Sequence, residues 1–471
     1  MRWARLGPSV SDHPNIVLVV FDTARRDRFG CYGYDRATTP TVDHLAREGL
    51  VLETMISNAP WTLPAHGSLF TGLYPSEHGA QWQTGPALRD AVGTTMAESL
   101  KGLGYDTWCV TNNGLISSKT RLARGFDTHV TRLDLEKGLP RVARRVPKAM
   151  FGGDSGGRIV NRWMREHLPR ASRPTFLFVN YMECHWAYAP PPEFARRVGG
   201  PRHRGIAGLR YRTSDAVKRG PWEAIARAGA EELERLSTLY DGELANADHH
   251  LAELLAILDK TGHLRQPTLV IVASDHGEHI GEHGLADHHA SLGDLLVRVP
   301  FVAWGPGIVE TGRSADTFEF VDVLPSLLER LGASVPAPLA GRRRGVFAGA
   351  GDGNAVSFAE WRAWPEGERA RLGRRNPSFD FAGLGRDLVS ARDGRFKLVR
   401  GSYGTRQLFD LEVDPAETTD RTAEARGEAE RLGQALDAAV GRWSAWEGAT
   451  TEVSAEEQAE IEARLEELGY I

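Results

Sequence analysis

Short apolar runs alternate with amphipathic stretches along most of the chain. The runs are rich in β-branched and aromatic residues and are bounded by Pro, Gly or Asn, which is typical of strands buried on both faces. They cover Ile16–Phe21, Thr107–Val110, Thr175–Val179, Thr268–Ala273 and Val299–Ala303. Because helical stretches separate these strands, the pattern predicts an α/β fold with a mostly parallel central sheet and helices on both faces.

Two helices can be placed in this pattern. Thr39 caps the first, Pro40 occupies its first position, and Gly49 ends it. A longer amphipathic repeat covers Ser237–Lys260 and is closed by Gly262. The polar residues of this second helix are interpreted as its solvated face: Asp241, Asp248, His249 and His250.

The character of the chain changes after about Gly332. A segment rich in Pro, Gly and Arg, Ala333–Gly353, is interpreted as a junction between lobes. Beyond it, Asp393-Gly394 predicts a hairpin turn, and Glu452–Leu468 has the pattern of an acidic terminal helix. We therefore predict an N-terminal extension over 1–14, a main domain over 15–335 and a smaller α+β C-terminal subdomain over 336–471.

Composition excludes several classes of function. A net charge of -5 over 471 residues does not indicate a nucleic-acid-binding protein. The Arg-rich runs are interpreted as solvated loops. No stretch approaches about eighteen consecutive apolar residues, so no integral membrane segment is expected, and the cytoplasm is the default location. The three cysteines have no close spacing, which argues against a disulfide framework. The oligomeric state cannot be predicted.

Residues able to bind a metal follow two of the predicted strands. Asp22 comes after the first strand and Asp275-His276 after the fourth, while Thr62 stands at the start of a helix. Taken singly, Asp22 could be a helix cap and Asp275-His276 a capped turn. Together the oxygen and nitrogen donors suit one divalent ion, with Mn²⁺ or Zn²⁺ favoured over Ca²⁺, which prefers oxygen alone.

Five motif blocks, in order along the chain, resemble the sulfatase-like family of the alkaline phosphatase superfamily. They are Pro14–Arg25 with Gly30–Tyr34, Ala59–Gly72, Tyr181–His185 with Ala189–Pro192, Ser274–Glu278 with Gly281–Gly284, and Leu408–Leu411 with Asp414–Glu417. The resemblance implies an alkaline phosphatase-like three-layer sandwich and a small antiparallel sheet in the C-terminal subdomain. It also makes the main domain the catalytic one.

The chain departs from the sulfatase pattern at its nucleophile. Sulfatases convert a Cys or Ser of a (Cys/Ser)-x-Pro-x-Arg signature to formylglycine, but Thr62 occupies that place and cannot be converted. A Thr hydroxyl can attack directly once a metal ion lowers its pKa, as in phosphoryl transfer. The pattern of Asp22, Thr62, Asp275 and His276 resembles that of lipoteichoic acid synthases, and His after Asp also occurs in phosphonate monoester hydrolases.

The resemblance implies further site residues. His185 and His288 match family histidines that donate protons or bind the non-bridging oxygens, and His66 stands where sulfatases keep an Arg. Arg25 and Asn113 are weaker candidates for contacts with the substrate anion. A nearby His-rich stretch invites a second metal, but we interpret its members as orienting the site because the necessary carboxylates are not evident: His279, His283 and His289.

Three hypotheses follow for function. The favoured one is a metal-dependent phosphoesterase or phosphotransferase with Thr62 as its nucleophile and an anionic small-molecule, lipid or glycan ester as its substrate. The second is a sulfatase acting without formylglycine, and the third is a catalytically silent binding protein. Substrate choice is expected in two long loops without periodicity, Thr131–Asp154 and Val198–Pro221.

Overall fold

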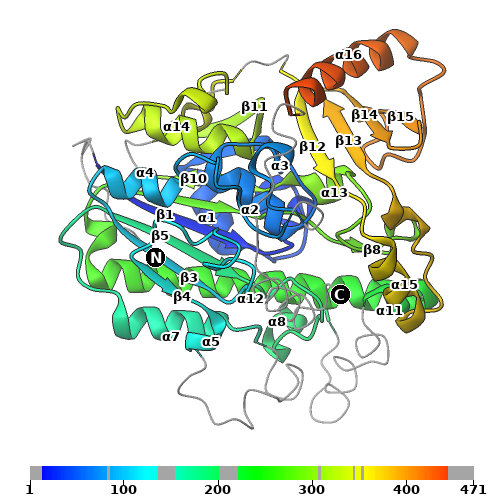
Figure 1. Ribbon diagram of the computed structural model, residues 1–471. Coiled ribbons are helices and arrows are strands. Elements are labelled where there is room, and N and C mark those ends of the chain that lie inside the picture. Colours follow the sequence, from blue (N-terminus) through cyan, green and yellow to red (C-terminus); the bar gives the residue numbers. More distant parts are fainter. Residues whose placement is uncertain are drawn as a thin grey trace.

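The computed structural model describes residues 13–81, 85–135, 154–200, 221–305, 309–342, 345–351 and 355–443. Within them a large mixed sheet has the strand order β11-β2-β10-β6-β1-β5-β3-β4, with β9 paired to β2 (Figure 1). Its strands are β1 (Asn15–Phe21), β2 (Leu50–Ile56), β3 (Asp106–Thr111), β4 (Thr128–Val130), β5 (Thr175–Tyr181), β6 (Thr268–Ala273), β9 (Arg298–Val299), β10 (Phe301–Trp304) and β11 (Gly312–Glu319).

The centre of this sheet is parallel and fully buried. β1 lies between β5 and β6 and pairs in parallel with both, so that Val19 stands beside Val179 on one side and Val272 on the other. All seven residues of β1 are buried, which is why the segment is apolar without alternation. Only β9 and β10 run antiparallel to their neighbours in this sheet. The predicted mostly parallel α/β sheet is therefore confirmed.

The prediction of a single strand over Val299–Ala303 was inaccurate. The segment forms β9 and β10, which are separated at Pro300, a residue that has no N–H for a sheet ladder. The strands β2, β4 and β11 were not predicted. In β11 the positions of Gly312, Arg313 and Ala315 are exposed, so its sequence lacks the apolar run expected of a buried strand.

Helices cover both faces of the sheet (Figure 1). One layer contains α1 (Pro40–Glu48), α7 (Gly157–His167), α8 (Pro192–Arg197) and α12 (Ala230–Thr261), with α12 in contact with the other three. The opposite layer contains α2 (Thr62–Thr71), α3 (Pro75–His78), α4 (Met96–Gly102) and α14 (Val323–Arg330). Shorter or peripheral elements are α5 (Arg132–Leu135), β7 (His279–Ile280), β8 (Ala286–Asp287), α11 (Pro221–Arg227), α13 (Asp294–Val297) and α15 (Glu366–Arg375).

The prediction that the polar residues of α12 face solvent was wrong for three of the four. His249 is exposed, but Asp241, Asp248 and His250 are buried. Asp241 binds Arg28 and Arg36, and Asp248 accepts hydrogen bonds from the first amides of α1. These polar side chains are inside because α12 is enclosed by the sheet and by three helices, where each of them finds a partner.

A second, four-stranded antiparallel sheet follows. It has the order β12 (Ser357–Trp361), β13 (Leu388–Arg392), β14 (Phe396–Gly401) and β15 (Arg406–Asp410), and α16 (Arg426–Trp443) packs on it. Asp393 and Gly394 connect β13 to β14, so the predicted hairpin is confirmed. The predicted terminal helix over Glu452–Leu468 lies outside the described residues, and the proposed division at 14 and 335 stays a prediction.

Lys397 of β14 joins the C-terminal sheet to α13 of the main body through an ion pair. Its Nζ lies 2.9 Å from Asp294 Oδ1, in the main body, and 2.9 Å from Glu417 Oε1, in the C-terminal part. The Lys397 side chain is fully buried, so its charge depends on these two carboxylates for its balance. Across the described part of the chain, no helix combines the length and apolar character needed to cross a membrane.

Candidate active site

The predicted site residues gather at one edge of the large sheet. Asp22 directly follows β1 and Asp275 lies two residues beyond β6, while Asn113 and His185 come shortly after β3 and β5. These strands are parallel, so their carboxyl ends meet at one edge, where ligands bind in open α/β sheets. Thr62 is the first residue of α2, the helix that follows β2 along the chain, and it lies at the same edge of the sheet. Its side chain is completely buried.

Asp22, Asp275 and His276 form a group that can hold a cation. Each offers a ligand atom, all three atoms lie within 4.8 Å of one another, and all three residues are buried. Neither Asp22 Oδ1 nor Asp275 Oδ2 has a hydrogen-bond partner among the residues that the structure describes. Buried carboxylate oxygens without partners are costly, so the donor set fits a divalent ion.

The second oxygen of each carboxylate accepts hydrogen bonds from the protein. Asn113 Nδ2 donates to Asp22 Oδ2 over 2.8 Å, and Asn180 Nδ2 approaches the same oxygen at 3.3 Å. The backbone amide of Thr23 donates to Asp275 Oδ1 over 3.1 Å. These bonds orient the remaining oxygen of each carboxylate, in the way that outer hydrogen bonds orient metal ligands.

His276 connects this group to Thr62. Its Nδ1 lies 2.9 Å from the carbonyl oxygen of Gly277, an arrangement that assigns the ring proton to Nδ1. The Nε2 atom then carries a lone pair, and it lies 3.3 Å from Thr62 Oγ1 and 3.3 Å from Asp275 Oδ2. Thr62 and the three ligand candidates are thus brought together as the sequence predicted, while their chemical roles stay predictions.

The two carboxylates differ in their affinity for protons. Burial, reinforced by the neighbouring charge of Asp275, raises the pKa of Asp22 above its ordinary value. Burial would also raise the pKa of Asp275, but its interactions with His276, His66 and the backbone amide of Thr23 outweigh this effect and hold that pKa well below its usual range. These two neighbouring buried acids therefore have pKa values shifted in opposite directions.

His66 lies one helical turn after Thr62. Its Nδ1 is 2.9 Å from the carbonyl oxygen of Thr62 and 3.6 Å from Asp275 Oδ2. The ring packs edge-on against Phe70 and Phe178, and burial lowers its pKa. His66 therefore contacts the backbone of the candidate nucleophile, and its catalytic role stays a prediction.

His185 and His288 stand next to the same group. Their ring centroids are 5.5 Å apart, and the centroid of His288 lies 4.4 Å from that of His276. Burial lowers the pKa of His185. Burial also acts to lower the pKa of His288, but the carboxylates of Asp287 and Glu278 outweigh it and raise this pKa to about 10.

Arg25 is placed differently from the other candidates. Its guanidinium forms ion pairs with Asp27 at 2.8 Å and with Glu282 at 2.6 Å, and the side chain is buried. Among the residues that the structure describes, no hydrogen bond or ion pair joins Arg25 to Asp22 or Thr62. Asn113, in contrast, is joined to Asp22 directly. The expected contact of Arg25 with a substrate anion stays a prediction.

Sequence reasoning missed two acids of the site. Asp287 Oδ1 lies 2.6 Å from His288 Nδ1, and Glu278 Oε1 lies 3.4 Å from the same nitrogen. We preferred orienting histidines in this stretch because carboxylates were not evident, and that reason was wrong. Asp287 directly precedes the predicted His288, and Glu278 belongs to a motif block, so both could have been found in the sequence.

Comparisons with known proteins identify the family of the chain. The family described as Sulfatase matches residues 14–333. An arylsulfatase of Clostridium perfringens is 23% identical, with 86% of this chain and 90% of the relative covered. The multifunctional alkaline phosphatase superfamily protein PehA of Trinickia caryophylli is 25% identical over the same shares.

The fold is shared with solved structures. The crystal structure of the phosphonate monoester hydrolase of Agrobacterium radiobacter superposes with a TM-score of 0.67 at 21% identity, covering 94% of this chain and 98% of that one. The alkaline phosphatase-like sandwich with its separate antiparallel sheet is thereby confirmed. Together with the match over most of the chain, this shows that the protein belongs to the sulfatase family and is a hydrolase of ester bonds.

Proposed function

We propose that the protein is a metal-dependent phosphoesterase or phosphotransferase in which Thr62 is the nucleophile. The observation that carries the proposal is the position of Thr62 Oγ1, 3.3 Å from His276 Nε2, beside two carboxylate oxygens without hydrogen-bond partners in the described chain. A hydroxyl next to a cation site is the arrangement that activates a weak nucleophile.

Asp22, Asp275 and His276 would hold one divalent ion, with Mn²⁺ or Zn²⁺ favoured because one donor is an imidazole. Such an ion, when bound, lowers the pKa of the Thr62 hydroxyl and screens an anionic substrate. Members of the family are metal-dependent, which supports this assignment. The mixed oxygen and nitrogen donor set argues against Ca²⁺, which prefers oxygen.

The remaining steps belong to residues of the chain. Thr62 Oγ1 loses its proton to water and forms a bond to phosphorus in line with the breaking bond to the leaving group, which gives a Thr phosphoester. His185 and His288 donate a proton to the leaving oxygen or contact the non-bridging oxygens. Water, or an acceptor alcohol, then cleaves the Thr ester.

Phosphorus is favoured over sulfur by the way in which this covalent ester is resolved. A sulfated formylglycine hydrate expels sulfate with its second hydroxyl, but a sulfated Thr has no such group and would persist. The arylsulfatase relative keeps the second candidate open, namely a sulfatase that acts without formylglycine. The presence of three intact ligand positions argues against a catalytically silent protein.

Purified protein assayed on aryl phosphate, phosphodiester, phosphonate and sulfate esters, with Mn²⁺, Zn²⁺ or Ca²⁺, tests the proposal. We expect kcat/KM for a phosphoester to exceed that for the matched sulfate at least about a hundredfold, or roughly 2.7 kcal/mol of transition-state discrimination. Equal or greater multiple-turnover activity on the sulfate would reject it in favour of the second candidate.

The expected substrate is an anionic small-molecule, lipid or glycan ester. The two loops expected to select it lie largely in 136–153 and 201–220, outside the described residues. We also propose a cytoplasmic location, and transfer to an acceptor alcohol as the alternative to hydrolysis.

A further inference from the structure

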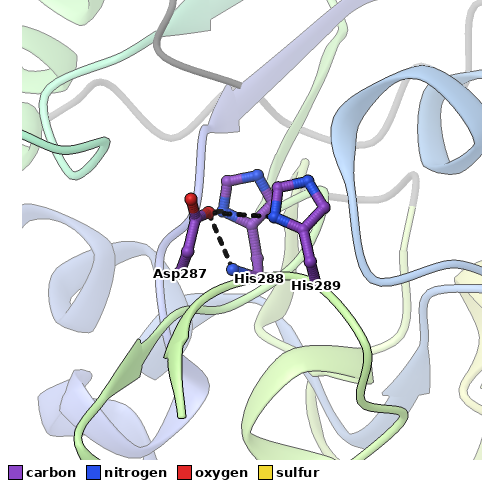
Figure 2. A group of neighbouring side chains, drawn as sticks. All are labelled: Asp287, His288 and His289. Carbon is purple, nitrogen blue, oxygen red and sulfur yellow. Dashed lines mark hydrogen bonds and ion pairs between the residues drawn. The ribbon is translucent and has the colours of Figure 1, made fainter. Parts of the chain in front are cut away.

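Three consecutive residues beside the candidate active site converge on one point. His288 Nδ1 and His289 Nδ1 lie 2.6 Å and 3.4 Å from the same oxygen, Asp287 Oδ1. Figure 2 shows the two rings side by side with this carboxylate at their edge, and their centroids are 4.5 Å apart. One ligand atom from each residue lies within 4.8 Å of the others.

The backbone explains how neighbouring side chains can meet. Successive residues of a strand point to opposite faces, but Asp287, the last residue of β8, has a φ of 66° and Ala290 has a φ of 57°. These left-handed positions end the strand pattern on both sides of His288 and His289. Both rings therefore turn towards the Asp287 carboxylate.

Glu278 adds a second carboxylate to this cluster. Its Oε1 lies 3.4 Å from His288 Nδ1. Its Oε2 has no hydrogen-bond partner among the described residues, and the side chain is only 1% exposed. A buried carboxylate oxygen without a partner is unfavourable unless a cation or a donor reaches it.

Aromatic rings keep water away from the cluster. The centroid of His289 lies 4.7 Å from Trp364, 5.5 Å from Trp361 and 5.7 Å from Trp222, and all three tryptophans are buried. In such a dry environment two carboxylates repel each other strongly. A divalent cation between them would cancel their charge.

We propose that Glu278, Asp287, His288 and His289 form a second site for a divalent cation of the Zn²⁺ or Mn²⁺ type. Two imidazole nitrogens and two carboxylates are the donors that such ions prefer. Bound there, the cation takes the place of the Nδ1 proton of His288. The site lies next to the Asp22 group, because the rings of His276 and His288 are 4.4 Å apart.

The test measures metal content, and it needs no substrate. The full-length protein is stripped with chelator, loaded with Mn²⁺, desalted and analysed for Mn²⁺ per chain by mass spectrometry. We expect two ions per chain and an electron paramagnetic resonance spectrum with coupling between neighbouring Mn²⁺ ions. Loading with Zn²⁺ is expected to give the same ratio.

Variants assign the two ions to their sites. His289→Gln and Asp287→Asn are each expected to retain one ion and to lose the coupling, and Asp275→Asn is expected to lose the other ion. The matched control is His283→Gln, since His283 belongs to the same loop but is exposed; it is expected to retain two ions. Circular dichroism verifies that each variant is folded.

One ion per chain in the wild type would overturn the second site and leave the proposed function intact. Two ions in folded His289→Gln and Asp287→Asn would also overturn it, because the second ion would then lie elsewhere. Two ions with no phosphoester activity would support this site and count against the proposed function, so the two failures are distinguishable.

Discussion

Thr62 Oγ1 lies 3.3 Å from Nε2 of His276, although 214 positions separate the two residues in the chain. The contact joins the start of α2 to the end of β6. The contact places the Thr62 hydroxyl beside the lone pair of a candidate metal ligand. The proposed role of Thr62 as nucleophile can be tested by substitution.

Thr62→Ala is expected to lower kcat/KM for a phosphoester at least about a thousandfold, since it removes the nucleophile. Thr62→Ser keeps a hydroxyl on the same atom and is expected to retain measurable activity. Steady-state kinetics on an aryl phosphate compares the three proteins. Wild-type rates in Thr62→Ala would show that another group attacks the substrate.

Residue 62 is expected to be an unmodified threonine in the purified protein. Formylglycine formation acts on the primary carbon of Cys or Ser, and the Cβ of Thr is secondary. Peptide mass spectrometry of the region Asn58–Tyr74 measures this directly. A peptide mass that required an aldehyde would contradict both the unmodified Thr and the proposed chemistry.

Asp275→Asn and His276→Ala are each expected to reduce bound metal and phosphoester activity together, because each removes a ligand of the Asp22 group. His249→Ala, at an exposed position of α12, serves as a control and is expected to change neither. Metal analysis and activity are measured on the same samples. Full metal content in both ligand variants would place the ion elsewhere.

His250 is expected to stabilise the protein in a pH-dependent way. Burial acts to lower its pKa, but hydrogen bonds to Asp154 and Glu253 outweigh this and raise it from 6.5 to about 10. A raised folded-state pKa gives stability that is complete below about pH 6.5 and is lost as the pH rises through about 10.

The free energy of unfolding of the wild type is therefore compared with that of His250→Gln at several pH values. The variant is expected to unfold about 3 kcal/mol more easily near pH 6, and the difference is expected to shrink steadily towards pH 10. Urea unfolding at pH 6, 8 and 10 measures it. A difference that is constant with pH would show that His250 acts through packing alone.

Lys397→Met is expected to lower the free energy of unfolding by about 3–5 kcal/mol, because it removes the buried cation that the largely buried carboxylates of Asp294 and Glu417 share. Lys101→Met is the control, since Lys101 pairs with Asp127 at the surface, where both side chains are about half exposed. The control is expected to cost less than about 1 kcal/mol. Equal losses would contradict the role of the buried pair.

The sequence by itself determined the class of fold and most of the site. Strands such as β1 are apolar along their whole length because both faces are covered. This unbroken apolar run can be recognised in the sequence of the strand itself. Asp22 and Asp275 follow such strands, so parallel topology alone brings them together. The hairpin at Asp393-Gly394 was equally visible, because its turn depends on two adjacent residues.

Tertiary structure decided what depends on distant partners. Asp248 and His250 lie on a helix whose periodicity is that of a surface helix, and they are buried because other segments supply hydrogen bonds and opposite charges. The convergence of the His288 and His289 rings on the Asp287 carboxylate depends on the left-handed backbone of Asp287. The burial of His289 depends on tryptophans from α11 and β12. Since packing between remote segments sets these environments, the residues themselves could be found in the sequence, but their burial and their contacts could not.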